Sequence, residues 1–98
     1  MIQELRCKLF PGQFSSEFAV VVESFYGQKF SLFASVDDVT CEQMPTHDVP
    51  TQGWLKVYPI EQRGNNVLVQ LPQSTLENGR FLPVRLDQLR EAVESLEV

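Results

Sequence analysis

The residues best suited to chemistry in this sequence are a single histidine and the aspartate beside it. His47 and Asp48 lie between Pro45 and Pro50, in a segment without apolar periodicity that predicts a loop. A histidine beside a carboxylate can act as a general base when a nucleophile or a substrate proton lies within hydrogen-bond reach. Nothing in the spacing places such a group there. A hydrolase or transferase using His47 and Asp48 is therefore the weakest of three functional hypotheses, and an exposed loop imidazole is the simpler interpretation.

The sequence pattern indicates no metal or cofactor site, and we expect neither. One histidine and two cysteines, Cys7 and Cys41, match no zinc-ligand spacing, and the carboxylates form no calcium-binding loop. The five glycines stand singly, so no glycine-rich phosphate loop is present. Cys7 is expected to point into the core as a small apolar residue. A bridge between Cys7 and Cys41 stays open, although a cytoplasmic chain would normally keep both thiols reduced.

The aromatic residues are the one feature above background. Four of them are candidates for a ligand site that takes a small apolar or cationic molecule, namely Trp54, Tyr58, Phe14 and Tyr26. For the aromatic set as a whole, filling the interior of a barrel is the simpler explanation. Trp54 stands beside the predicted loop of residues 45–53 and fits either interpretation. The sequence therefore favours an aromatic core and leaves a pocket near Trp54 as the alternative.

The chain is acidic, and its charges are unevenly distributed. Its formal net charge is −5, from eight Lys and Arg residues and thirteen Asp and Glu residues. Four acidic residues follow one another with no Lys or Arg between them: Asp37, Asp38, Glu42 and Asp48. Because contacts to phosphates dominate nucleic-acid affinity, an acidic chain without a basic stripe is a poor nucleic-acid binder. We expect no nucleic acid among its partners.

Length and composition fit one globular domain over residues 1–98. The chain is 43% hydrophobic and 21% charged, which suits a single chain with its own core. No apolar run approaches the ~20 residues of a membrane-spanning helix. The first residues lack the basic and apolar segments of a secretory signal. The sequence predicts a cytoplasmic protein that does not bind a membrane.

Six segments have the composition and alternation of β-strands. In the first, Leu5, Cys7 and Leu9 alternate with charged residues, which predicts a strand with one buried and one solvated face. The six predicted strands are residues 2–10, 17–25, 29–35, 54–61, 67–71 and 80–86.

The second and third predicted strands are expected to form a tight hairpin around Gly27 and Gln28. In that register Phe25 faces Phe30, and Glu23 faces Leu32. A carboxylate buried at Glu23 would need a basic partner such as Arg85 or Lys56.

Two helices complete the predicted fold. Ser35 and Asp38 have the spacing of a capping box, which predicts a short central helix from Val36 to about Gln43. After Asp87, a good N-cap, three apolar residues recur at helical spacing and predict an amphipathic C-terminal helix: Leu89, Val93 and Leu96. The expected class is α+β and β-rich, with about six antiparallel strands in a small barrel or a strongly coiled sheet.

The two halves of the sequence align when residues 1–48 are laid over residues 51–98. The clearest match closes each half, where Val36-Asp37-Asp38-Val39 stands against Leu86-Asp87-Gln88-Leu89. Such a match indicates either a twofold internal repeat of a βββα unit or two unrelated meanders that share one alternation.

One stretch resembles a known group of proteins. The order Pro11-Gly12-Gln13-Phe14-Ser15-Ser16-Glu17, Gly27, Phe30-Ser31-Leu32-Phe33 and Val36 is similar to small bacterial proteins that mobile integron gene cassettes encode. The match lies in the first half of the chain and contains no catalytic motif. Because this group has no assigned activity, the resemblance implies a bacterial source and transfers no functional residue.

The leading functional hypothesis is a non-enzymatic protein-interaction module. Its partner is expected to be a second copy in a homodimer, with Leu89, Val93 and Leu96 in the interface, or another protein. The alternative is a small-molecule-binding β-barrel with Trp54, Tyr58 and Phe14 at its mouth and residues 45–53 as a lid.

Overall fold

The computed structural model describes residues 2–77 and 79–92, and within them the chain is all β apart from two short 3-10 turns. The first half holds β1 (Gln3–Pro11), β2 (Glu17–Glu23), β3 (Lys29–Ser35), the turn η1 (Val36–Asp38) and β4 (Val39–Cys41). The second half holds β5 (Thr51–Arg63), β6 (Asn66–Gln70), β7 (Phe81–Arg85), the turn η2 (Leu86–Gln88) and β8 (Leu89–Glu91). Each of the six predicted strands is confirmed by an observed one.

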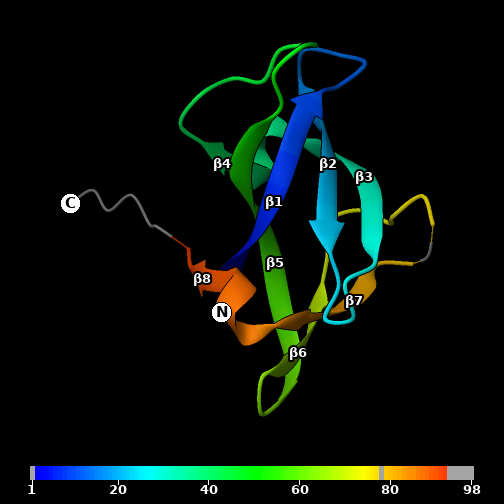
Figure 1. The fold of residues 1–98 in the computed structure, drawn as a ribbon, viewed down its shortest axis with the longest axis vertical. Helices are drawn as coiled ribbons and strands as arrows, with labels where there is room; N and C mark the ends of the chain where they lie inside the picture. Colours follow the sequence, from blue (N-terminus) through cyan, green and yellow to red (C-terminus); the bar gives the residue numbers. More distant parts are fainter. Residues whose placement is uncertain (1, 78, 93–98) are drawn as a thin grey trace.

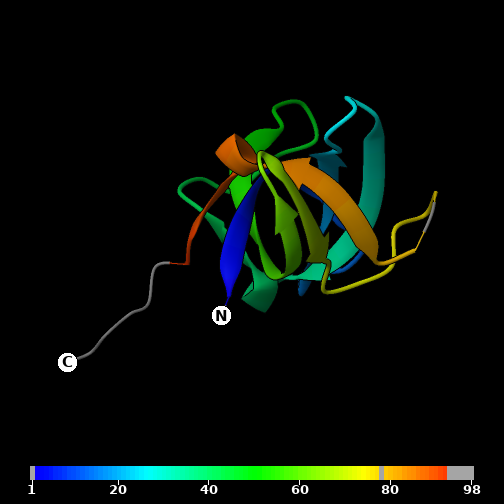
Figure 2. The same ribbon diagram turned by 90° about the horizontal axis from the view of Figure 1, so that it is seen from below.

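All strand pairs are antiparallel and belong to one curled sheet. The order along the sheet is β3-β2-β1-β5-β6-β7. β4 pairs with β5 on the side away from β1, and β8 pairs with β1 on the side away from β5. β1 and β5 cross the middle of the molecule (Figure 1). Seen from below, the sheet bends into a half-barrel (Figure 2). This curvature gives the sheet a buried inner face and an outer face.

The two halves place the same elements fifty residues apart along the chain. The turn η1 covers residues 36–38 and η2 covers residues 86–88. The pair β1–β5 has Leu5 opposite Leu55, residues that are themselves fifty positions apart. Residues 39–41 pair with 53–55, just as residues 89–91 pair with 3–5. The backbone therefore has a twofold arrangement centred on the Leu5–Leu55 pair. The predicted βββα unit was wrong, because each described half ends in a 3-10 turn and a short strand and not in a helix.

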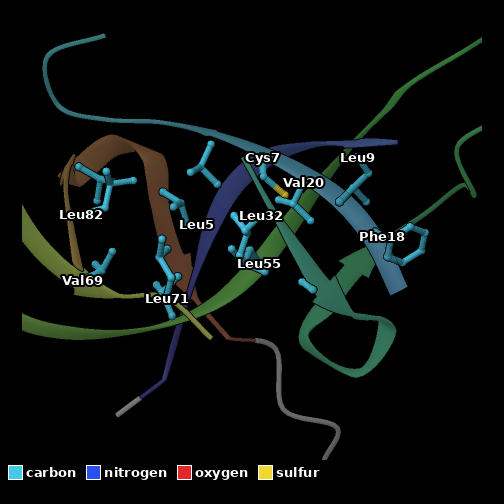
Figure 3. Close-up of a cluster of buried hydrophobic side chains, with 14 of the residues drawn as sticks. Leu5, Cys7, Leu9, Phe18, Val20, Leu32, Leu55, Val69, Leu71 and Leu82 are labelled. Carbon is cyan, nitrogen blue, oxygen red and sulfur yellow. The ribbon is translucent and has the colours of Figure 1, made fainter. Parts of the chain in front are cut away.

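The core is a layer of aliphatic side chains on the inner face. Figure 3 shows Leu5 and Leu55 near its middle, with Val69, Leu71 and Leu82 on one side of them. The buried apolar residues are Leu5, Cys7, Leu9, Phe18, Val20, Val22, Leu32, Ala34, Leu55, Val57, Val67, Val69, Leu71, Leu82 and Val84. The prediction that Leu5, Cys7 and Leu9 of β1 point into the core is thus confirmed. Burial of this apolar surface is the main source of stability.

The α+β class and the central helix were wrong predictions. Ser35 does cap a turn, because its Oγ accepts a hydrogen bond from the Asp37 amide at 3.1 Å. However, the turn stops at Asp38, and Val39 enters β4, where it pairs with Leu55. The capping residue therefore starts a single turn, which does not continue as a helix because the next three residues pair with β5 as a strand.

The C-terminal amphipathic helix is also wrong as far as the structure describes it. Leu89 lies in β8 opposite Leu5 and packs against the core from a partly buried position. Val93 and Leu96 lie outside the described residues. The helical spacing of the apolar residues was misleading, because Leu89 is buried by a strand contact.

The predicted hairpin register is wrong by three residues. Glu23 lies opposite Lys29, not Leu32, and is exposed. The connection is longer than two residues because the Ser24 Oγ accepts hydrogen bonds from the amides of Tyr26 and Gln28, each at 3.2 Å. Gly27, with φ of 85°, completes the turn. A shift by an odd number changes which residues of β3 share a face with each residue of β2. Val20 therefore lies opposite Leu32 on the inner face, and the exposed Glu23 needs no buried partner.

Candidate functional site

The predicted His47–Asp48 pair lies in the connection between β4 and β5. Both residues are exposed, and the loop turns through hydrogen bonds between Thr46 and Val49. Neither side chain forms a hydrogen bond or an ion pair with another described residue. The structure therefore places the pair on an exposed loop, where neither side chain holds a nucleophile among the described residues through a hydrogen bond.

The four aromatic candidates are distributed over the molecule. Phe14 (68% exposed) lies in the turn before β2, and Tyr26 (72% exposed) lies in the turn after it. Tyr26 packs edge-to-face on Phe25, with 5.2 Å between ring centroids. Tyr58 is on the outer face of β5, four residues beyond Trp54, which corresponds to about 13 Å along a strand. Of these four, Trp54 lines a hollow that also holds charged groups, Arg90 and Glu42.

Trp54 carries an arginine on its ring face. It lies on the outer face of β5, between Arg6 of β1 and Thr40 of β4. The Cζ atom of Arg90, from β8, lies 4.0 Å from the centroid of the Trp54 ring. Stacking of a guanidinium on an indole is a favourable cation–π contact. The indole thereby contacts the Arg90 guanidinium on one face of its ring.

A buried carboxylate fixes the same guanidinium from the other side. Glu4 is 2% exposed, although it lies on the outer face of β1. Its Oε1 accepts from Arg90 Nε at 2.8 Å, and its Oε2 accepts from Thr40 Oγ1 at 2.8 Å. A carboxylate is buried at a cost of about several kcal/mol unless it is paired and hydrogen-bonded. Both of its oxygens accept hydrogen bonds here, so Glu4 is satisfied and holds the Arg90 side chain in position.

The stacked pair lies in an open hollow of about 680 Å³ between the sheet and the β4–β5 connection. We call it the Trp54 hollow. Its lining includes Glu42, Val49, Pro50, Gln52, Trp54 and Arg90. Val49 and Pro50 are apolar, while Arg90 and Glu42 carry opposite charges. The hollow therefore combines one oriented cation with an apolar wall and one carboxylate.

A second hollow of about 560 Å³ lies where the pairing of β1 is interrupted. On one side, β1 pairs with β8 through residues 3–5 and with β2 through residues 8–11, which leaves Arg6 and Cys7 without an opposite residue. We call this gap the Lys8 hollow. Its lining includes Arg6, Cys7, Lys8, Glu23, Lys29 and Gln52. It is therefore more basic than the Trp54 hollow.

The two cysteines are free. Cys7 and Cys41 lie opposite Gly53 from its two sides, two strand spacings apart. That distance is about 9–10 Å, beyond the reach of a disulfide. Burial raises the pKa of the Cys7 thiol to about 12, with smaller contributions from Cys41 and Glu4. Cys7 is therefore a core residue and not a nucleophile.

No group of three or more His, Cys, Asp or Glu side chains that could hold a metal ion occurs among residues 2–77 and 79–92. Across that same part of the chain, no helix is long and apolar enough to cross a membrane.

Sequence reasoning found Trp54 but missed Glu4, Thr40 and Arg90. The offset of fifty residues held a usable signal, because Glu4 aligns with Trp54 and Thr40 aligns with Arg90. Positions that are equivalent about a twofold axis, and close to it, lie near one another. Charged and hydrogen-bonding residues at such positions could have been combined into one cluster.

Comparison with protein-family models, with curated proteins and with solved structures finds no match to this chain. The resemblance to integron-cassette proteins therefore stays a prediction.

Proposed function

We propose that the protein is a non-enzymatic binding module that takes an anionic ligand in the Trp54 hollow. The observation that carries this proposal is the orientation of Arg90, which Glu4 holds at 2.8 Å and which stacks on Trp54 at 4.0 Å. A guanidinium has five N–H donors in a fixed plane and suits planar carboxylates. Among the described residues, the hydrogen bond of Arg90 to Glu4 uses Nε alone, so donors on its Nη atoms are available for a ligand.

The same contacts disfavour a cationic ligand. A cation would need the ring face of Trp54, and Arg90 covers that face. The apolar residues Val49 and Pro50 suit the body of a ligand, while the Glu42 carboxylate opposes a second negative charge. The chemistry of the Trp54 hollow therefore fits a single carboxylate with an apolar group beside it.

Trp54 supplies the readout for a test, since it is the single tryptophan of the chain. Its fluorescence is titrated with benzoate and hexanoate, and with hexylammonium as the cationic comparison. We expect saturable changes with the two carboxylates, and a loss of affinity of about tenfold or more in Arg90→Gln, since the charge-assisted bonds are removed. The matched control is Arg63→Gln, because Arg63 is exposed and its one ion pair among the described residues is with Glu61, two residues away.

Equal affinities in Arg90→Gln and the unsubstituted protein would contradict the proposal. So would a saturable response to hexylammonium alone, which would favour the cationic ligand expected from the aromatic residues.

Self-association is a second candidate function, favoured by apolar residues on the outer face of β5 and β7. Tyr58 (49% exposed) and Phe81 (54% exposed) lie in one row across the sheet, on either side of Gln70. Native mass spectrometry distinguishes monomer from dimer directly. A dimer that Phe81→Glu converts to monomer supports this candidate, and a monomer at all concentrations contradicts it.

A further inference from the structure

Four of the eight basic residues gather on one face and have no ion-pair partner among the described residues. Arg63 and Arg85 pair with neighbouring carboxylates, Arg90 pairs with Glu4, and Arg80 donates to the carbonyls of Leu71 and Pro72. The four others are Arg6, Lys8, Lys29 and Lys56. Strand register places all four on the outer face of the sheet, opposite Trp54, Gln52, Glu23 and Glu4 respectively. The outer face thus holds four basic residues without an ion pair, in a chain of net charge −5.

The Lys8 hollow collects three of these cations. Arg6, Lys8 and Lys29 line it, against one carboxylate, Glu23. The amide side chain of Gln52 also lines it and can donate hydrogen bonds, whereas Gln88 is buried and its Nε2 already donates to the Glu23 carbonyl at 2.8 Å. A hollow with this lining suits an anionic group.

The Lys8 hollow and the Trp54 hollow are neighbours on the sheet. Gln52 lines both of them. Along β1, Glu4 lies opposite Arg90 and Lys8 lies opposite Gln52. The four residues from Glu4 to Lys8 correspond to about 13 Å along a strand. One extended ligand can therefore reach both hollows if its negative groups are spaced by a similar distance.

We propose that the outer face of β1 and β5 binds an extended acidic peptide segment, with one carboxylate at Arg90 and a second, about four residues away, at Lys8 and its neighbours. This inference rests on the proposed function, because the first carboxylate occupies the Trp54 hollow. An extended peptide repeats every ~3.3 Å, so side chains four residues apart match the spacing of the two hollows. The occupant is a peptide of another protein that carries spaced Asp or Glu residues.

Charge distribution favours such a peptide over a nucleic acid. Affinity for nucleic acid grows with the number of phosphates that are neutralised. Each hollow contains one carboxylate, Glu42 in the first and Glu23 in the second. These carboxylates repel a continuous row of phosphates, while two spaced carboxylates avoid them.

The test measures the binding of labelled peptides by fluorescence anisotropy at low ionic strength. The main probe has two glutamates separated by three serines, and the comparison peptides have one glutamate or two adjacent glutamates. A short oligothymidylate represents single-stranded nucleic acid. We expect the spaced peptide to bind about tenfold or more tightly than either comparison peptide.

Two variants test the position of the second carboxylate. Gln52→Glu places a negative charge between the hollows and is expected to lower the affinity for the spaced peptide by about tenfold. Its matched control is Gln70→Glu, on the outer face of β6, which should have no effect. In the double variant Lys8→Gln and Lys29→Gln, the spaced peptide should bind only as tightly as the single-glutamate peptide.

The outcomes separate this inference from the proposed function. Binding of benzoate without any preference for spaced glutamates overturns the peptide proposal and leaves the Trp54 hollow as a carboxylate site. Absence of all carboxylate binding overturns both. Tighter binding of oligothymidylate than of the spaced peptide, abolished by the Lys8 and Lys29 substitutions, overturns the peptide in favour of nucleic acid.

Discussion

The two halves of the chain fold alike but contribute different chemistry to the outer face. Position 4 is glutamate in the first half, and its counterpart in the second half is Trp54; position 40 is threonine, and its counterpart is Arg90. These four residues meet in one cluster because β1 pairs with β8 and β5 pairs with β4 around the Leu5–Leu55 centre.

The difference between the halves shows where binding chemistry can arise in such a sheet. The inner face needs similar apolar residues from both halves, since they share one core. The outer face next to the twofold centre has no such requirement. One half supplies the carboxylate and the hydroxyl, and the other supplies the indole and the guanidinium. Different residues at paired positions therefore create an asymmetric site on a nearly symmetric backbone.

The largest effect is expected at the centre of the sheet, where the halves are alike. Leu5 and Leu55 are both 0% exposed and lie opposite each other. Leu5→Ala and Leu55→Ala should each lower the free energy of unfolding by about 2–5 kcal/mol, through lost burial and a new cavity. Urea denaturation measures both. A difference between them of more than about 2 kcal/mol would break the equivalence of the halves.

The second effect depends on pH and distinguishes Cys7 from its counterpart, Val57. Burial raises the pKa of Cys7 from 9.0 to about 12. Above pH 9 the unfolded thiol loses its proton while the folded thiol keeps it, so the free energy of unfolding falls as pH rises to 12. The slope is about 1.4 kcal/mol per pH unit.

Cys7→Val makes the two halves alike at this position and should remove that slope. Comparing urea denaturation of the two proteins above pH 9 isolates the contribution of the thiol from that of other groups. Parallel pH profiles would show that Cys7 does not stay protonated in the folded chain.

A smaller effect is expected at Gly53, which lies between the two cysteines. A Cβ atom there would lie 2.5 Å from Leu9 Cδ1 and 3.0 Å from the Thr40 carbonyl oxygen. Gly53→Ala should therefore cost about 1–3 kcal/mol through overpacking. Gln3, the counterpart of Gly53, provides the control, since Gln3→Ala should change stability by less than about 0.5 kcal/mol. Thermal unfolding of both variants makes the comparison.

The smallest effect concerns the two 3-10 turns, which are capped differently. In η1 the Ser35 hydroxyl accepts from the Asp37 amide, whereas in η2 the Gln88 Oε1 accepts from the amide of Arg85 at 2.7 Å. Ser35→Ala should cost about 1 kcal/mol. Arg85→Ala keeps its amide and loses only an exposed ion pair, so it should cost less than about 0.5 kcal/mol. The reverse order in denaturant titrations would contradict this account of the caps.

Local patterns in the sequence were sufficient to predict the strands and one residue of the site. Alternation located β3 at residues 29–35 and placed Leu5, Cys7 and Leu9 inside. The helices failed because a cap and helical spacing are also present in a turn followed by a three-residue strand. Glu4 was expected on a solvated face, and its burial depends on Arg90, which is 86 residues away. Contacts at that separation leave no local periodicity to detect.

The pairing of β1 with β8 also has a kinetic meaning. Residues 3–5 find their partners at residues 89–91, so this contact is among the most distant in sequence that the described chain makes. Closing so long a loop is entropically costly, and contacts of this kind slow the folding of β proteins. We expect β8 to join the sheet late, after the two meanders have formed. The cluster of Glu4, Thr40, Trp54 and Arg90 is then assembled only in the last step, so ligand binding reports that the sheet has closed.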